Sequence, residues 1–122
     1  MPTKQQTFNT VVKALFKQNC RSASSPPDDA NSRCFYRGPN ESKCAAGHLI
    51  PDEKYQSKME GISINKYNIV GKVLQEQGHD LHLCFALQSV HDKYEVEYWK
   101  EQFAEVAQRF HLEFDSSLKL GE

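Results

Sequence analysis

The apolar residues of the chain recur with helical spacing in four separate stretches. In the first stretch they lie three and four positions apart, so they share one face of a helix over residues 5–19. The same spacing predicts further helices over 64–77, 82–93 and 95–110. No run of alternating β-branched and polar residues is long enough to require a sheet. The pattern therefore predicts a mainly α fold, a small helical bundle around one core.

Residues at the ends of these stretches support the predicted helices. Ser63 is a favoured N-cap for the second helix, and Gly78 suits the left-handed residue that follows its last turn. Asp80 is placed to cap the third helix. Beyond the fourth helix, Leu112 and Phe114 alternate with polar residues, which predicts a short extended tail docked on the bundle.

Between the first two helices the periodicity disappears. Residues 21–33 contain two consecutive prolines among Ser, Asp and Asn, which predicts a mobile, linker-like loop. Residues 34–61 form a long irregular segment with Cys, Gly and Pro, whose small apolar residues predict a path close to the core. Within it, Pro51 opens a short helical turn, and residues 34–36 suit a minor strand pair with the tail.

Length and composition bound the class of protein. A chain of 122 residues, 39% hydrophobic and 25% charged, fits a single soluble domain spanning residues 1–122. No apolar run approaches the roughly 18 residues of a membrane span. The first residues lack the apolar core of a signal peptide, so we expect a cytoplasmic location and four reduced cysteines.

The charge is distributed unevenly along the chain. All charged side chains of residues 1–24 are basic, whereas acidic residues outnumber basic ones from Glu76 onward. These are either two solvated helix faces of opposite sign or an acidic surface that meets a basic partner. Bulk nucleic-acid binding is disfavoured because no basic stripe with interleaved aromatic residues exists.

The irregular segment offers candidate metal ligands. Cys34, Cys44 and His48 supply two thiols and an imidazole in one short stretch, and His82 is available as a fourth ligand. Zinc accepts this mixture in tetrahedral geometry, and an irregular segment gains stability from such a site. The spacing matches no standard zinc motif, and buried thiols with a surface histidine explain the same residues. The other candidates for the fourth ligand are His79 and Cys84.

Cys44 is also a candidate nucleophile. A thiol at the start of a helical turn has its pKa lowered by the N–H groups there, and Cys44 precedes Ala-Ala-Gly. His48 or His91 would act as the base, with Asp52 or Asp92 orienting it. The alternative is that the thiol packs in the core beside the two alanines that follow it.

A first candidate binding patch consists of Tyr36, Arg37 and Lys43. An arginine in a Gly-Pro turn is suited to grip a phosphate or carboxylate with two hydrogen bonds. The alternative is structural, with Arg37 paired internally to Asp52 or Glu60.

A second candidate patch surrounds the start of the last helix. Tyr94 and Tyr98 lie off its core stripe, so they are available as interface anchors. With Glu97, Glu101 and Glu105 they form an acidic, tyrosine-bearing face, which suits a protein partner or a seam between two copies of the chain.

Several short motifs occur in the irregular segment and in the predicted third and fourth helices. They are Cys34-x-Tyr-Arg-Gly-Pro39, Lys43-Cys-Ala-x-Gly47, Leu49-Ile-Pro-Asp52, Tyr55, Met59-Glu-Gly61, Leu87-Gln-x-x-His-Asp92 and Trp99. This part of the chain carries a resemblance. It is similar to a loose group of short, uncharacterised bacterial and phage proteins. The resemblance implies an origin in phages or mobile elements, whose short proteins often act as inhibitors or accessory factors. It implies no catalytic residues.

Three functional hypotheses follow. The leading one is a non-enzymatic interaction protein without a cofactor, encoded by a phage or mobile element and inhibiting a host defence system. The second is a small metal- or cysteine-dependent enzyme centred on Cys44 and His48. The third is a sponge for a small ligand or nucleotide, using Arg37 and Lys43. No P-loop, dinucleotide-binding or serine-hydrolase motif occurs, which disfavours enzymes built on those motifs.

Overall fold

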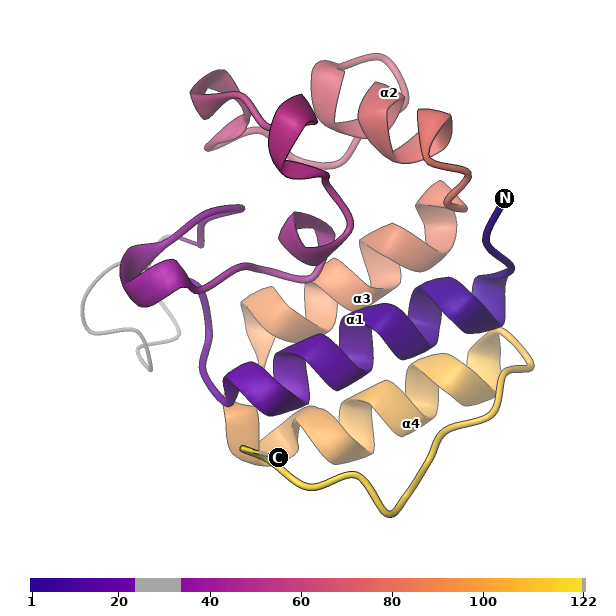
Figure 1. Ribbon diagram of the computed structural model, residues 1–122. Helices are drawn as coiled ribbons and strands as arrows, with labels where there is room; N and C mark the ends of the chain where they lie inside the picture. Colours follow the sequence, from indigo (N-terminus) through magenta and orange to yellow (C-terminus); the bar gives the residue numbers. More distant parts are fainter. Residues whose placement is uncertain (24–33, 122) are drawn as a thin grey trace.

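The computed structural model of the chain describes residues 1–23 and 34–121. These residues form four α-helices and five short 3₁₀ turns, so the predicted mainly α fold is confirmed. Helices α1, α3 and α4 lie side by side (Figure 1). The chain from η3 to α2 forms the upper part of the molecule in this view, beyond α3. The elements are α1 (Lys4–Gln18), η1 (Pro39–Glu41), η2 (Ala46–His48), η3 (Asp52–Lys54), η4 (Ser57–Met59), α2 (Ile69–Glu76), α3 (Leu81–Lys93), η5 (Val96–Tyr98) and α4 (Trp99–Arg109).

Helix α1 buries the apolar face that its spacing predicted. Thr3 caps it in a reciprocal capping box with Gln6. Its buried Phe16 packs against Phe103 of α4, with ring centroids 6.2 Å apart. The tail docks on the same helix, because the Phe114 ring meets Phe16 edge-on at 6.4 Å. The Gly121 N–H also donates to the Phe16 carbonyl at 2.7 Å, so the predicted docked tail is confirmed.

The predicted strand pair between residues 34–36 and the tail is wrong. Cys34 instead forms a single antiparallel bridge with Ala23, and the Phe35 N–H donates to the Ser22 carbonyl at 2.8 Å. The tail packs against α1 and bonds to its Phe16 carbonyl, and its described residues do not pair with residues 34–36.

Helix α2 begins later than predicted. Asn68, rather than Ser63, is its N-cap, and the Asn68 side chain accepts the Gly71 N–H at 3.1 Å. The chain before it turns tightly over Gly71, where an added Cβ would lie 1.9 Å from the Asn65 carbonyl oxygen. Residues 62–65 therefore remain outside the helix.

The predicted helix over 95–110 is divided into two elements. The 3₁₀ turn η5 precedes α4, which begins at Trp99. Trp99 is fully buried and donates its indole N–H to the Tyr94 carbonyl at 3.1 Å. Insertion of this large ring fixes the turn between α3 and α4.

The first residues of the predicted mobile loop are buried. Arg21 is 3% exposed, and both Ser22 and Ala23 are 0% exposed, so the linker prediction is wrong for residues 21–23. Arg21 donates from Nε to the His91 carbonyl at 3.0 Å and from Nη2 to the Asp92 carbonyl at 2.7 Å. It thereby caps the C-terminus of α3 instead of joining a solvated basic face. Residues 24–33 lie outside the described residues.

A carboxylate fixes the path of the irregular segment. Glu60 accepts the backbone N–H of Tyr36 at 2.9 Å and that of Arg37 at 3.0 Å. The Tyr55 hydroxyl donates to the same carboxylate at 2.6 Å. Three charge-assisted hydrogen bonds therefore tie the two ends of residues 36–60 together.

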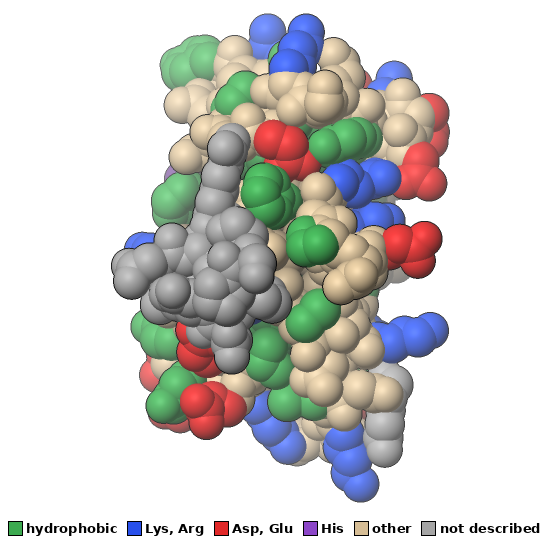
Figure 2. Space-filling model, turned by 90° about the vertical axis from the view of Figure 1, so that its left-hand side faces the viewer, with side chains coloured by type: hydrophobic (Ala, Val, Ile, Leu, Met, Phe, Trp, Pro, Cys, Tyr) green, Lys and Arg blue, Asp and Glu red, His purple; other side chains and the backbone are tan. Residues whose placement is uncertain are grey.

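Figure 2 shows the face of the molecule that carries this segment. Hydrophobic side chains reach the surface along the middle of the face, and Lys and Arg lie mostly at its edges. Among the described residues, no helix has the length and apolar character needed to cross a membrane.

We predict that Glu60→Ala lowers the free energy of unfolding by about 2 kcal/mol, because it leaves two backbone N–H groups and one hydroxyl without an acceptor. The measurement is chemical denaturation followed by circular dichroism. The matched control is Glu53→Ala, an exposed carboxylate on η3, which should change stability by less than about 0.5 kcal/mol. Equal effects of the two variants would contradict the role given to Glu60.

Candidate functional site

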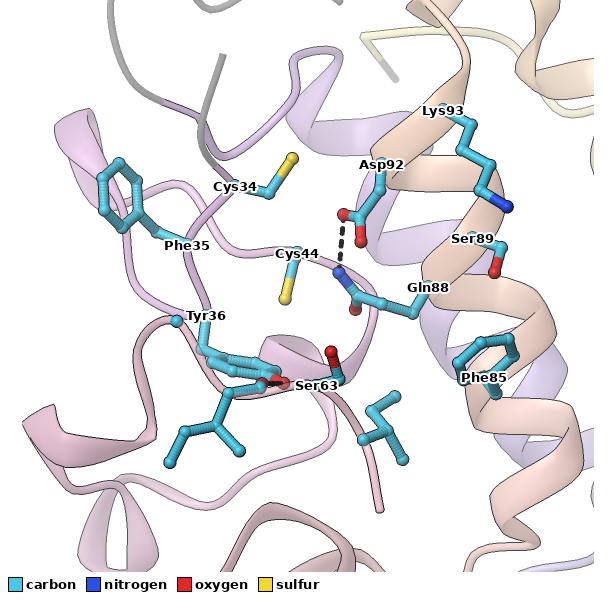
Figure 3. Close-up of a pocket in the computed structure, with 13 residues that line it drawn as sticks. Cys34, Phe35, Tyr36, Cys44, Ser63, Phe85, Gln88, Ser89, Asp92 and Lys93 are labelled. Carbon is cyan, nitrogen blue, oxygen red and sulfur yellow. Dashed lines mark hydrogen bonds between the residues drawn. The ribbon is translucent and has the colours of Figure 1, made fainter. Parts of the chain in front are cut away.

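A cavity of about 400 Å³ opens between α3 and the irregular segment. Figure 3 shows Gln88, Ser89 and Asp92 on α3 facing Tyr36 and Cys44 across it. The cavity mixes thiol, hydroxyl, amide and carboxylate groups, so it is the first place to look for chemistry. The described residues that line it are Cys34, Phe35, Tyr36, Cys44, Gly61, Ile62, Ser63, Ile64, Phe85, Gln88, Ser89, Asp92 and Lys93.

Three potential metal ligands meet at one end of this cavity. The ligand atoms of Cys34, His91 and Asp92 all lie within 4.8 Å of one another. His91 is fully buried, and its two ring nitrogens are both engaged. Nε2 accepts the Ser22 N–H at 2.9 Å, so Nδ1 carries the proton and donates to Asp92 Oδ1 at 2.9 Å. Burial lowers the pKa of His91, although Asp92 opposes the shift.

This arrangement fits a metal ion poorly. A metal bound at Nδ1 of His91 would move the ring proton to Nε2, where it would face the Ser22 N–H donor. The Arg21 guanidinium also lies 3.3 Å from the Cys34 sulfur and repels a cation. Burial, followed by Asp92, raises the pKa of Cys34 to about 11, which disfavours the thiolate that a metal requires.

The structure does not gather the zinc ligands predicted from the sequence. Among the described residues, Cys34 groups only with His91 and Asp92, and the other predicted ligands lie outside that group. His82 is exposed on α3, and Cys44 is buried beneath the cavity.

The predicted nucleophile Cys44 lies in a setting that keeps it protonated. It is 1% exposed, and burial raises its pKa far above the ordinary thiol range. The Gly47 N–H reaches its sulfur at 3.4 Å, which offsets only part of that shift. The predicted bases are engaged elsewhere: His48 bonds Gln18 at 3.0 Å, and His91 bonds Ser22 and Asp92.

The first predicted patch is largely internal. Tyr36 is 7% exposed, and its hydroxyl donates to the Ile62 carbonyl. Arg37 pairs with Asp52 at 2.8 Å and stacks over Tyr55 at 4.8 Å, as its structural alternative predicted. Asp52 and Glu41 also line the hollow beside Arg37 and Lys43, so their carboxylates would repel an anion bound there.

The second predicted patch is exposed. Tyr94 is 38% exposed and Tyr98 50% exposed. Glu97, Glu101 and Glu105 are exposed as well, and none forms an ion pair with a described residue. A groove of about 440 Å³ between α3 and α4 borders this face, with Tyr94, Gln102 and Glu105 among its walls.

The sequence patterns missed a second exposed surface. Phe85 is 55% exposed on α3, and its position off the stripe of Leu83, Ala86 and Leu87 was the available signal. Tyr67 falls within the predicted second helix, yet it lies before α2 and is 76% exposed. Comparison with protein-family models, curated proteins and solved structures finds no match for this chain.

We predict that acid destabilises the protein through the half-buried His48. Burial lowers the pKa of His48 to about 4, so the native state keeps it neutral while the unfolded chain takes up a proton below its ordinary pKa. This stability is present at pH 7 and is lost as the pH falls towards 4. His48→Gln, which cannot titrate, should lose about 1–2 kcal/mol less than the wild type between pH 7 and pH 5.

The measurement is urea unfolding at each pH. His82→Gln is the matched control, since His82 is exposed on α3, and it should follow the wild type. A His48→Gln profile that parallels the wild type would remove His48 as a source of acid sensitivity.

We also predict that zinc does not stabilise the native protein. The tautomer of His91 and the position of Arg21 disfavour a metal at the Cys34 cluster, so equimolar Zn²⁺ and excess chelator should give the same thermal midpoint. Native mass spectrometry in the same two solutions should show the apo mass. A zinc adduct that is lost in the double variant Cys34→Ser/Asp92→Asn would overturn this prediction.

Proposed function

We propose that the protein is a non-enzymatic interaction protein that binds a basic surface of a partner protein. The binding surface is the acidic face, defined as Tyr94, Glu97, Tyr98, Glu101 and Glu105. The observation that supports it is that these three exposed glutamates form no ion pair with the described residues, while two exposed tyrosines lie beside them.

The composition of the acidic face suits recognition of a protein. Tyrosine supplies a large, rigid contact area at low entropic cost and is enriched among the residues that dominate binding energy. The surrounding carboxylates speed association with a basic partner and set its orientation. The groove between α3 and α4 gives the partner a concave surface beside Tyr94.

The chemistry of the cavity favours binding over catalysis. The two cysteines nearest to it are held as thiols, and the buried histidine beside it has both nitrogens engaged. Inhibition by covering a partner's surface needs no reactive group. We propose, from the resemblance to short phage proteins, that the partner belongs to a host defence system.

The test is affinity capture from a host lysate with the charge-reversed variant Glu97→Lys/Glu101→Lys/Glu105→Lys. We expect at least a tenfold loss of the partner that the wild type retains, because each reversal replaces attraction by repulsion. Capture by the wild type should also weaken as the salt concentration rises.

The matched control reverses three exposed glutamates on other segments, Glu41, Glu53 and Glu76. Both triple variants change the net charge equally, so only the position of the charges differs. Equal losses in the two variants, or an unchanged capture by the first, would contradict the acidic face. A wild-type dimer that only the acidic-face variant dissolves would identify the face as a seam between copies.

A further inference from the structure

A second groove runs along the outward side of α3, opposite residues 62–65. It consists of two hollows of about 400 Å³ each, which share Ile64 and Phe85 in their walls. Phe85, which is 55% exposed, lies where the two hollows meet, and Tyr67, which is 76% exposed, borders one of them. Figure 3 shows Phe85 and Ser89 on α3 across from Ser63. We call this surface the α3 groove, and its central walls are Ile62, Ile64, Tyr67, Leu81, Phe85 and Ser89.

One wall of the α3 groove has the character of an unpaired strand edge. Half-buried Ile62 and Ile64 alternate with exposed Ser63 and Asn65, as side chains do along a strand. The Ile62 carbonyl accepts from the Tyr36 hydroxyl, and the Ser63 carbonyl accepts from the Asn68 amide at 2.8 Å.

The remaining polar groups of this wall are open. The N–H groups of Ser63 and Ile64 and the carbonyl of Ile64 form no hydrogen bond with any described residue. Backbone groups left in this way at the border of a groove are a template for pairing with an added strand.

The charges of the groove define the ends of its occupant. Lys66 lies at one end and Lys93 at the other, and neither has a carboxylate of a described residue within 4.0 Å. One acid, Asp92, lines the groove beside Lys93, and its Oδ1 accepts from Gln88 at 2.8 Å and from His91 at 2.9 Å. The described walls therefore carry two basic side chains and one acidic side chain. The ends of the groove therefore favour acidic groups, and its middle favours apolar ones.

We propose that the α3 groove binds an extended peptide segment of a partner protein, with acidic ends and apolar side chains at alternate positions. The N–H groups of consecutive residues in an extended chain point to opposite edges, so the segment pairs with the N–H and carbonyl of Ile64, which are both open. Its apolar side chains contact Phe85 and Tyr67.

The length of the groove sets the length of this segment. From His82 to Lys93, α3 rises about 16 Å at its ordinary pitch. This distance corresponds to about five residues of an extended strand. The α3 groove contains no residue of the acidic face, although it shares Ser89 and Lys93 with the groove that borders that face. It therefore extends the proposed function to a second contact of opposite charge preference.

The experiment titrates the ¹⁵N-labelled full chain with a pool of acetylated, amidated pentapeptides, Glu-Φ-Thr-Φ-Glu, in which Φ is Val, Ile, Leu or Phe. We expect the amide resonance of Ile64 to shift downfield and to saturate below about 1 mM peptide. The same pool with proline in place of threonine should bind at least tenfold more weakly, because proline cannot donate a main-chain hydrogen bond. A pool with lysine at both ends should also bind more weakly.

Two variants assign the binding to the groove. Phe85→Ser removes an exposed apolar side chain from the wall of the groove, and Lys66→Glu/Lys93→Glu reverses the charge at both ends. Each variant should bind the peptide pool at least tenfold more weakly than the wild type. Tyr98→Ser on the acidic face is the matched control and should bind the pool like the wild type. An amide spectrum of each variant confirms that it is folded before the titration.

Several outcomes would overturn the proposal. These are no shift at Ile64 up to about 1 mM peptide, shifts confined to the α3–α4 side, or equal binding of the proline-containing pool. A shift of the Ile64 amide with protein concentration alone would assign the groove to a second copy of the chain. Tighter binding of oligo(dT), by base stacking on Phe85 and Tyr67, would assign it to single-stranded nucleic acid. None of these outcomes alters the effect of the acidic-face charge reversal, so the two proposals fail separately.

Discussion

The contact of Arg21 with the end of α3 is the interaction on which the rest of the structure depends. A guanidinium that is 3% exposed is costly unless its donors are satisfied, and here they reach the carbonyls of His91 and Asp92. The same residues return a bond to the chain, because His91 Nε2 accepts the Ser22 N–H. This exchange fixes residues 21–23 against α3, and Ala23 in turn bridges Cys34. The entry to the irregular segment is thereby set by one buried polar network.

A second polar clamp sets the exit of that segment. Glu60 gathers the N–H groups of Tyr36 and Arg37, so the chain leaves next to the point where it entered. Beyond Glu60, the tight turn over Gly71 delays α2 and leaves residues 62–65 extended beside α3. The cavity and the α3 groove thus arise from two clamps and one glycine contact, and apolar packing fills the space beneath them.

The sequence predicted the long periodic elements well and the polar connections poorly. α1 and α3 begin and end within one residue of the predicted bounds, because an uninterrupted apolar stripe and strong caps agree there. The predicted start of the second helix was wrong because the side chains of Asn65 and Asn68 stabilise a turn in the backbone there. The spacing of apolar residues does not reveal such a turn. The exposed tyrosines of the acidic face were identified from their position off the core stripe.

The role of Arg21 was unpredictable for a related reason. Its bonds go to main-chain carbonyls 70 and 71 residues away, and a carbonyl is present at every position whatever the side chain. Spacing therefore carries no sign of the contact, and the tautomer of His91 depends on it in turn. The candidate metal cluster likewise came from this long-range pairing, which brought Cys34 rather than Cys44 to a histidine.

Helix α3 connects the two proposed binding surfaces physically. Ser89 and Lys93 line both the cavity at the end of the α3 groove and the groove that borders the acidic face. A partner bound in either groove therefore contacts Ser89 and Lys93, which also line the other groove. Because Arg21 and His91 hold the C-terminus of α3 from within, the helix is a rigid wall between the surfaces. Lys93 also stands between an acidic surface and a groove that favours acidic ends, so its charge opposes a basic partner on one side and attracts a carboxylate on the other.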